Sequence, residues 1–177
     1  MSKTKWLSDP AHSEIGFKVR HMMITNVTGN FDVFTVEMQS SEADFSDAEM
    51  QFEADIASVN TRNAQRDEHV RSADFFNAAV HPKMTFQSTS FKKVVDNEYT
   101  LAGILSMCGI SRNMSLPVTF TGTVIDPWGQ VKAGFEIGGV INRSDFGLKW
   151  NTITDEGTIA LDEQVKLIVN VQLVKQV

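Results

Sequence analysis

The residues of this chain best suited to metal binding or nucleophilic catalysis are four histidines and one cysteine. The histidines are His12, His21, His69 and His81, and the cysteine is Cys108. None stands at an H-x-x-x-H or C-x-x-C spacing, which would bring metal ligands together. A nucleophilic cysteine needs a base and an electropositive setting, yet no histidine is near Cys108 in the sequence. No G-x-S-x-G motif occurs either. We therefore expect no metal site, no cofactor and no enzymatic activity.

The strongest polar cluster is the run 66–69, which reads Arg-Asp-Glu-His. One interpretation is an ion-pair and capping network on a solvated helix. The other is a polar mouth for an anionic ligand group, because a guanidinium can donate two parallel hydrogen bonds to such a group. Arg143 has the same two interpretations, since it could instead pair with Asp67 or Asp74. The candidate polar residues are Arg66, Asp67, His69 and Arg143.

Composition narrows the class of protein. The chain has 177 residues and a net charge of -6, which suits a single domain over 1–177 and argues against general binding to nucleic acid. One cysteine excludes an intramolecular disulfide framework. No apolar run reaches the length of a transmembrane helix, and no apolar stretch follows the lysines of the first ten residues. We therefore expect a cytoplasmic protein, or a periplasmic one if a signal peptide was removed.

Alternation of apolar and polar residues dominates the chain and predicts β-strands. It is clearest over 50–56, 118–124 and 165–173, with shorter candidates at 15–19, 84–86, 99–107 and 133–137. A further strand over about 27–38 changes phase between Val33 and Phe34, which suggests a bulge. Turn sequences at 95–98 and 126–129 indicate antiparallel hairpins.

One segment breaks the alternation, at about 62–76. It reads as a short, mostly charged helix that lies on a surface or over an opening, with Asn60, Thr61 or Asn63 as its cap. The rest amounts to about eight strands with one apolar face each. The expected fold is all-β, a closed barrel or a sandwich. Alternation alone does not distinguish a ligand cavity from a filled core.

Short motifs occur in a specific order along the chain. They are Trp6-Leu-Ser-Asp9-Pro10-Ala-His12-Ser13, Val19-Arg20-His21-Met22, Ala57-Ser-Val-Asn60-Thr61, Arg66-Asp67-Glu68-His69-Val70-Arg71-Ser72-Ala73-Asp74-Phe75-Phe76, His81-Pro82, and Ile141-Asn142-Arg143-Ser144-Asp145-Phe146-Gly147-Leu148-Lys149-Trp150-Asn151. In this order they closely resemble the YceI-like family of bacterial proteins, from Trp6 to about Leu173. The chain departs from the family pattern at Ile104, Cys108 and Asn113.

The resemblance implies a single antiparallel, eight-stranded, lipocalin-like barrel. It also implies an elongated hydrophobic cavity that holds a polyisoprenoid or another long amphiphile, and it implies a homodimer. Apolar residues on strand faces usually form a packed core. The resemblance implies instead that these residues line a cavity. The predicted lining is Phe17, Val19, Phe52, Ile56, Met84, Phe86, Leu101, Leu105, Met107, Val118, Phe120, Phe135 and Ile137.

The first functional hypothesis is therefore a non-enzymatic carrier of a long-chain lipid. A second is an enzyme acting on an isoprenoid-like or quinone-like substrate, although no catalytic set is recognisable. A third is a stress-related structural protein with an incidental cavity.

Overall fold

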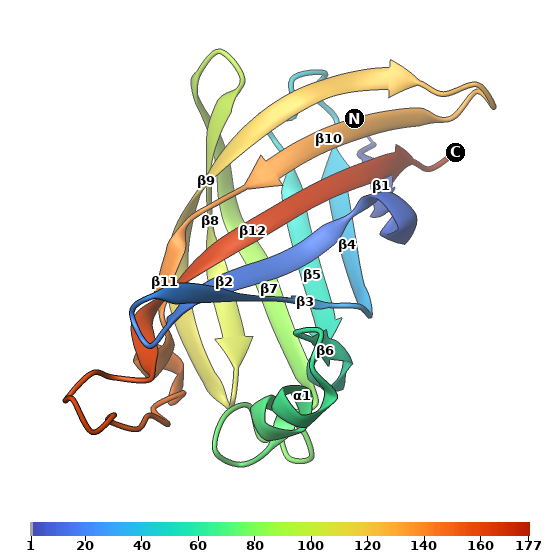
Figure 1. The fold of residues 1–177 in the computed structure, drawn as a ribbon. Coiled ribbons are helices and arrows are strands. Elements are labelled where there is room, and N and C mark those ends of the chain that lie inside the picture. Colours follow the sequence, from blue (N-terminus) through green and yellow to red (C-terminus); the bar gives the residue numbers. More distant parts are fainter. Residues whose placement is uncertain (1) are drawn as a thin grey trace.

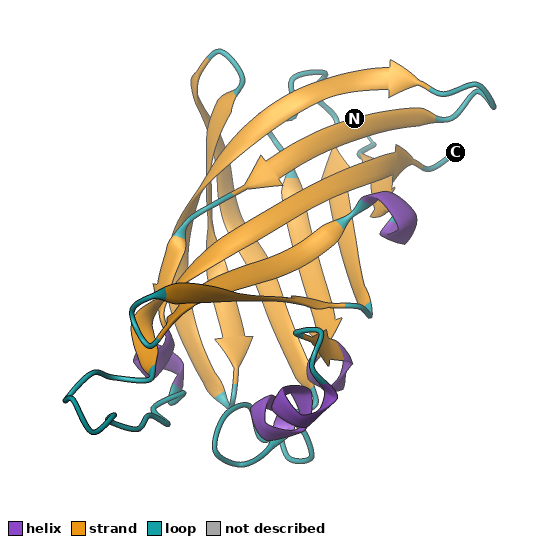
Figure 2. Cartoon of the chain, viewed as in Figure 1, coloured by secondary structure: helices purple, strands orange, loops and turns teal. Residues whose placement is uncertain are grey.

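The computed structural model describes residues 2–177 and is built almost wholly from β-strands (Figures 1 and 2). Its elements are β1 (Thr4–Ser8), β2 (Glu14–His21), β3 (Thr25–Phe31), β4 (Phe34–Ser40), β5 (Glu49–Asp55), β6 (Val59–Asn60), α1 (Ala64–Arg71), β7 (Lys83–Val95), β8 (Glu98–Met107), β9 (Ile110–Ile125), β10 (Val131–Ile137), β11 (Val140–Asn142) and β12 (Leu161–Lys175).

The strands close into a barrel. The hydrogen-bonded order β1-β4-β5-β7-β8-β9-β10-β12 is completed by antiparallel pairing of β1 with β12. β2 also pairs with β12, so β1 and β2 are two stretches of one bent strand. Likewise, β3 pairs with β2 while β4 pairs with β1. The ring thus has eight antiparallel members, and the predicted barrel, rather than the sandwich, is confirmed.

The phase change predicted near Val33 is a break between strands, not a bulge. β3 ends at Phe31 and β4 begins at Phe34, with a bend between them. The break lets Phe31 and Val36 both face inwards and leaves Val33 exposed. Both predicted turns connect hairpins as expected. In the second, the Asp126 carboxylate accepts hydrogen bonds from the backbone N–H groups of Trp128 and Gln130, each at 2.9 Å.

The helix is shorter than the predicted segment 62–76. Asn63 caps α1, since its side-chain oxygen accepts a hydrogen bond from the Arg66 N–H at 3.0 Å. Arg62 precedes the cap in a left-handed conformation, with φ of 65°. At the other end, the Ser72 hydroxyl donates to the His69 carbonyl at 2.6 Å, and turns follow.

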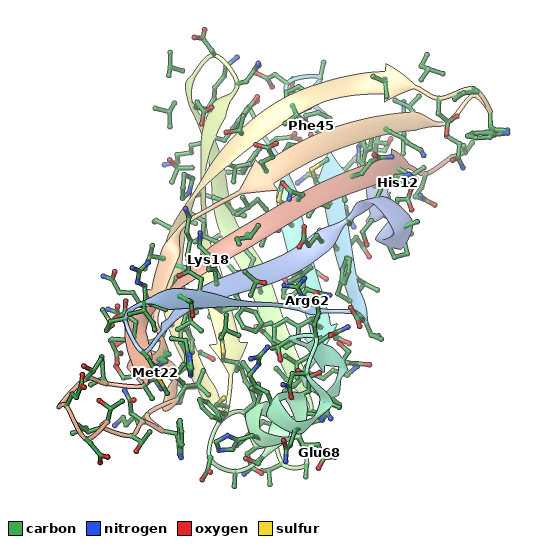
Figure 3. The ribbon with its side chains drawn as sticks, in the orientation of Figure 1. His12, Lys18, Met22, Phe45, Arg62 and Glu68 are labelled. Atoms are coloured by element: carbon green, nitrogen blue, oxygen red, sulfur yellow. The ribbon has the colours of Figure 1, made fainter. Side chains whose placement is uncertain are left out.

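One end of the barrel is plugged by Phe45 (Figure 3). This residue comes from the β4–β5 loop, adopts a left-handed φ of 60° and is buried. Its ring packs against Trp6, Phe120 and Phe135 at centroid distances of 5.4, 5.4 and 5.6 Å. Figure 3 places Glu68 of α1 at the opposite end. The barrel therefore has a packed end at Phe45 and a second end beside α1.

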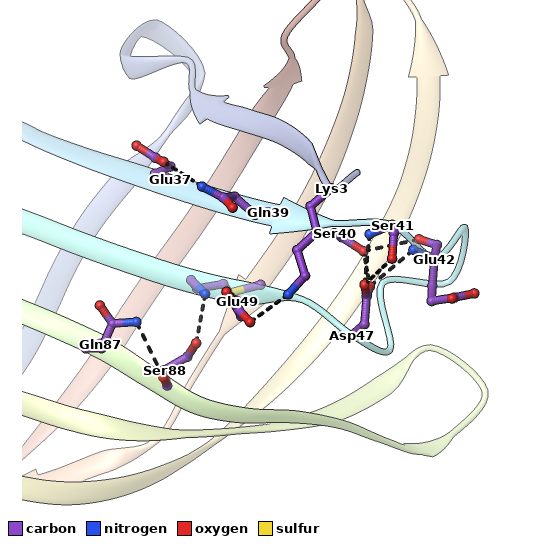
Figure 4. Close-up of polar contacts among 11 residues, drawn as sticks. Lys3, Glu37, Gln39, Ser40, Ser41, Glu42, Asp47, Glu49, Gln87 and Ser88 are labelled. Atoms are coloured by element: carbon purple, nitrogen blue, oxygen red, sulfur yellow. Dashed lines mark hydrogen bonds and ion pairs between the residues drawn. The ribbon is translucent and has the colours of Figure 1, made fainter. Parts of the chain in front are cut away.

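The Asp47 carboxylate holds the plugging loop in place (Figure 4). It accepts hydrogen bonds from the Ser40 hydroxyl at 2.5 Å, the Ser41 N–H at 2.9 Å and the Glu42 N–H at 3.2 Å. These hydrogen bonds hold the pKa of Asp47 far below its ordinary value of 3.8. The hydrogen bonds to Asp47 therefore brace the loop that carries Phe45.

Replacing Asp47 by asparagine is expected to lower the melting temperature at pH 7, because asparagine lacks the second acceptor oxygen. A carboxylate with a depressed folded-state pKa stabilises the fold above its unfolded-state pKa, and that stabilisation is lost as the pH falls towards the folded-state value. The difference between wild type and Asp47→Asn should therefore shrink below about pH 4. Thermal melts across pH 2–7 measure it. A difference that stays constant with pH would contradict the assigned role.

Candidate functional site

The barrel contains a cavity of about 430 Å³ with an almost wholly apolar lining. Its walls come mainly from β2, β5, β7, β8 and β12, with one or two residues each from β3, β4, β9, β10 and β11. Residues of α1 and the segment 148–161 surround its outer end. The cavity therefore lies towards the end beside α1, away from the Phe45 plug (Figures 1 and 3).

Most of the predicted lining residues do face this cavity. They are Phe17, Val19, Phe52, Met84, Phe86, Leu101, Leu105, Met107 and Ile137.

The lining prediction was wrong for Ile56, Val118, Phe120 and Phe135, which are absent from the cavity wall. Phe120 and Phe135 pack on the plug instead, with ring centroids 5.3 Å apart. Val118 and Ile56 are almost fully buried among side chains. All four occupy inward-facing positions of the alternating pattern. That pattern does not show whether another side chain packs against an inward-facing residue or leaves a cavity beside it.

Several lining residues were missed. Val165, Leu167, Val169 and Val171 of β12 line the cavity, and the alternation over 165–173 was a sufficient signal for them. Phe75 and Phe76 also line it. They follow α1 in a turn region without periodicity, so alternation could not place them, although both stand in the motif 66–76 that carries the family resemblance.

The polar candidates divide into two groups. Arg66, His69 and Arg143 border the cavity, whereas Asp67 does not. Asp67 is buried and accepts hydrogen bonds from the Thr61 N–H at 2.8 Å and the Thr61 hydroxyl at 2.5 Å. Arg66 donates to the Thr61 hydroxyl at 2.9 Å and to its carbonyl at 2.6 Å. Asp67 therefore fixes α1 to the chain before it, as the first interpretation of the polar cluster expects, and it does not border the cavity.

His69 connects α1 to the segment that follows β11. Its ring lies edge-on to Trp150 at a centroid distance of 4.8 Å and to Phe75 at 5.1 Å. Its Nε2 is 2.9 Å from the Asp74 carboxylate. All three rings line the cavity, so this aromatic contact ties α1 to the segment that carries Trp150 at the cavity wall.

Arg143 is a buried cation, with 4% of its surface exposed. It pairs with neither Asp67 nor Asp74. Its guanidinium donates to the backbone carbonyls of Asp162, Leu148 and Trp150 at 2.8, 2.7 and 2.7 Å. Burial lowers the pKa of the Arg143 guanidinium, and nearby carboxylates oppose that shift. Arg143 thus fastens the segment carrying Trp150 to the start of β12.

Arg143→Ala is expected to destabilise the protein, since it removes these donors and leaves buried carbonyls without partners. Hydrogen bonds to a charged group contribute roughly 1.5–3 kcal/mol, so the melting temperature should fall by about 5 °C or more. Amide hydrogen exchange should accelerate around residues 148–151. Unchanged exchange in that segment would contradict the positioning role.

Cys108 and the possible metal ligands were also candidates for chemistry. Cys108 is half-buried, and burial raises the pKa of its thiol, which disfavours the nucleophilic thiolate. Within residues 2–177, no group of three or more His, Cys, Asp and Glu side chains is arranged to hold a metal ion. The same residues include no helix long and apolar enough to cross a membrane.

An antiparallel barrel plugged at one end and hollow towards the other defines a lipocalin-like, cavity-bearing protein. The YceI-like domain model matches residues 6–173, so the chain belongs to the YceI-like family. Protein YceI of Escherichia coli O157:H7 is 35% identical over 165 residues, covering 93% of this chain and 83% of that protein.

Solved structures agree with this assignment. A YceI protein of Campylobacter jejuni superposes with a TM-score of 0.76 at 31% identity, covering 96% of each chain. A domain from Saccharophagus degradans, described as polyisoprenoid-binding, superposes with a TM-score of 0.68 at 16% identity, over 97% of this chain and 98% of that one. At that identity the second likeness concerns the fold alone.

Proposed function

We propose that this protein is a non-enzymatic carrier that holds the apolar chain of a long amphiphile, such as a polyisoprenoid, inside its barrel. The observation that carries the proposal is the apolar cavity of about 430 Å³. Its volume falls in the range of about 300–1,000 Å³ that is typical of ligand sites. Each CH₂ group removed from water contributes roughly 0.8 kcal/mol. A chain of this kind can therefore bind tightly without a specific headgroup contact.

The polar residues near the outer end support an orientation for the ligand. The wall towards Phe45 is apolar, whereas Arg66, His69 and Arg143 border the cavity beside α1. An amphiphile would place its chain against the apolar wall and its headgroup near these residues.

The direct test is organic extraction of purified protein, followed by mass spectrometry, together with titration of a fluorescent long-chain probe. The expected result is a co-purified lipid, or saturable uptake of one probe per chain. An interior that contains no lipid and excludes the probe would overturn the proposal.

A paired titration tests the headgroup. The phosphate and free-alcohol forms of one polyprenol are titrated against wild type, Arg66→Ala and Arg143→Ala. Because both guanidinium groups already donate to the protein, we expect the two forms to lose affinity equally. A loss above tenfold for the phosphate alone, as one charge-assisted hydrogen bond would produce, would instead establish an anionic headgroup site.

A further inference from the structure

An exposed apolar surface adjoins the cavity at the β2–β3 turn. It consists of Met22, Met23 and Ile24 at the β2–β3 turn, with Ile153 and Ile159 in the segment 151–160. Figure 3 labels Met22 at that turn. Ile24 is 76% exposed and Ile153 is 70% exposed. We call these five residues the apolar collar.

Hydrogen bonds join the two parts of the collar. The Met22 N–H donates to the Ala160 carbonyl at 2.8 Å. Ile153 and Ile159 form an antiparallel bridge, and the Thr154 N–H donates to the Thr158 carbonyl at 2.8 Å. The segment 151–160 is therefore a small hairpin fastened to the β2–β3 turn, so the two parts of the collar are adjacent.

The collar is also continuous with the cavity. Met22 contributes both to the collar and to the cavity lining, and Thr152 and Ala160 of the hairpin line the cavity as well. An apolar chain leaving the cavity at this end would pass from the lining onto the collar.

The β2–β3 turn has apolar residues at positions where its backbone favours other residue types. Met22 and Met23 both have left-handed conformations, with φ of 51° and 61°. Glycine, asparagine and aspartate are the residues that such turns favour, because other side chains are strained there. Two methionines followed by an exposed isoleucine therefore favour neither the turn conformation nor exposure to water. Contact with an apolar phase accounts for them.

A lipid surface fits the collar better than a second copy of the chain. The collar has five exposed apolar side chains on two loops, whereas each partner of a standard-size interface contributes about 20–30 residues. A second copy seated there would also cover the end of the cavity that α1 borders. Interfacial binding to a bilayer requires only that apolar side chains enter the headgroup boundary.

Charge around the collar indicates which lipids it prefers. Asp155 and Glu156 are at the tip of the hairpin, Arg20 lies beside the turn, and the chain carries a net charge of -6. This balance gives no attraction to an anionic surface. We propose that the apolar collar docks the protein on electrically neutral lipid bilayers, with the end of the cavity beside α1 facing the membrane. Docking itself does not depend on the proposed function. Only the uptake of a lipid from the bilayer into the cavity rests on it.

The test is flotation of the protein with phosphatidylcholine vesicles. Ile24→Asp combined with Ile153→Asp should weaken vesicle binding by about tenfold or more, because burying one isoleucine side chain favours binding by at least that factor. Ile125→Asp is the matched control. Ile125 is 72% exposed and precedes the β9–β10 turn, away from the cavity, so this variant should bind as wild type does. Raising the salt concentration or adding phosphatidylglycerol should not strengthen binding.

Three further measurements separate the inference from the carrier proposal. The double variant should keep wild-type affinity for a detergent-dispersed probe while extracting that probe from vesicles more slowly. If wild type binds the probe but not the vesicles, or if the double variant binds vesicles normally, docking is refuted and the carrier proposal stands. If vesicles are bound and the probe is not, the carrier proposal fails and docking stands. A dimer that the double variant dissociates in analytical ultracentrifugation, with vesicle binding unchanged, would assign the collar to a second copy and overturn the inference.

Discussion

Leu105→Arg is expected to abolish uptake of a long-chain probe and to lower the stability of the barrel strongly. Leu105 lies on β8, is buried and faces the cavity. An arginine there would place an unpaired charge among apolar side chains, and substitutions of this kind destabilise by about 4 kcal/mol or more. The melting temperature should fall by roughly 10 °C. Probe titration and thermal melts measure the two effects.

The matched control is the adjacent residue of the same strand. Ile104→Arg introduces the same side chain, but Ile104 is exposed on the outer face. Uptake should stay within about twofold of wild type, since surface substitutions usually change stability by no more than about 0.5 kcal/mol. Should Ile104→Arg prove the more damaging change, the assignment of inner and outer faces would be inverted.

Phe135→Ala is expected to cause the largest loss of stability among simple truncations. Phe135 is 2% exposed, and its ring contacts Phe45, Phe91 and Phe120 at 5.6, 6.2 and 5.3 Å. Truncating a packed phenylalanine typically costs about 3–5 kcal/mol, because the cavity it leaves is not refilled. Chemical denaturation measures the loss. Probe affinity per folded molecule should remain close to that of wild type, since Phe135 does not line the existing cavity.

Phe52→Ala provides the contrast at the hollow end. Phe52 is only partly buried and lines the cavity, so its removal forfeits fewer contacts and should destabilise the protein less. Probe affinity, however, should change measurably because the wall of the cavity changes shape. Equal losses of stability in the two variants would contradict the division of the barrel into a packed end and a hollow end.

The two ends of the barrel differ in how their interiors are filled. Trp6, Phe45, Phe120 and Phe135 fill the end away from α1 and contribute packing. The other end remains open in its interior, and the lining there consists of the same apolar residue types. Dense aromatic packing and cavity volume therefore occupy different ends of one barrel.

Local patterns in the sequence predicted the local features. Alternation located strands such as 50–56 and 165–173, turn residues located the hairpins at 95–98 and 126–129, and Asn63 was among the predicted helix caps. These features depend on neighbouring residues, so neighbouring residues reveal them. The order of motifs also identified the family, and with it the barrel.

The location of the cavity depended on contacts between distant residues. Phe120 and Leu105 have the same inward phase, yet one packs against Phe45 and the other faces empty space. Alternation reports which face a side chain occupies, and it contains no information about what stands opposite. Asp67 likewise belonged to a promising polar cluster, but folding directed its carboxylate to Thr61.

By itself, then, the sequence determined most of the strands, the two turns and the inward and outward faces, and it limited the helix cap to Asn60, Thr61 or Asn63, because each of these is decided within a few residues of chain. Only the tertiary structure decided where the barrel is filled and where it is hollow. That outcome depends on Phe45, which a loop without periodic pattern carries into the barrel, and on Arg143, which fastens Leu148 and Trp150 beside the cavity. Both effects arise from contacts between segments far apart in the chain, and local periodicity does not encode such contacts.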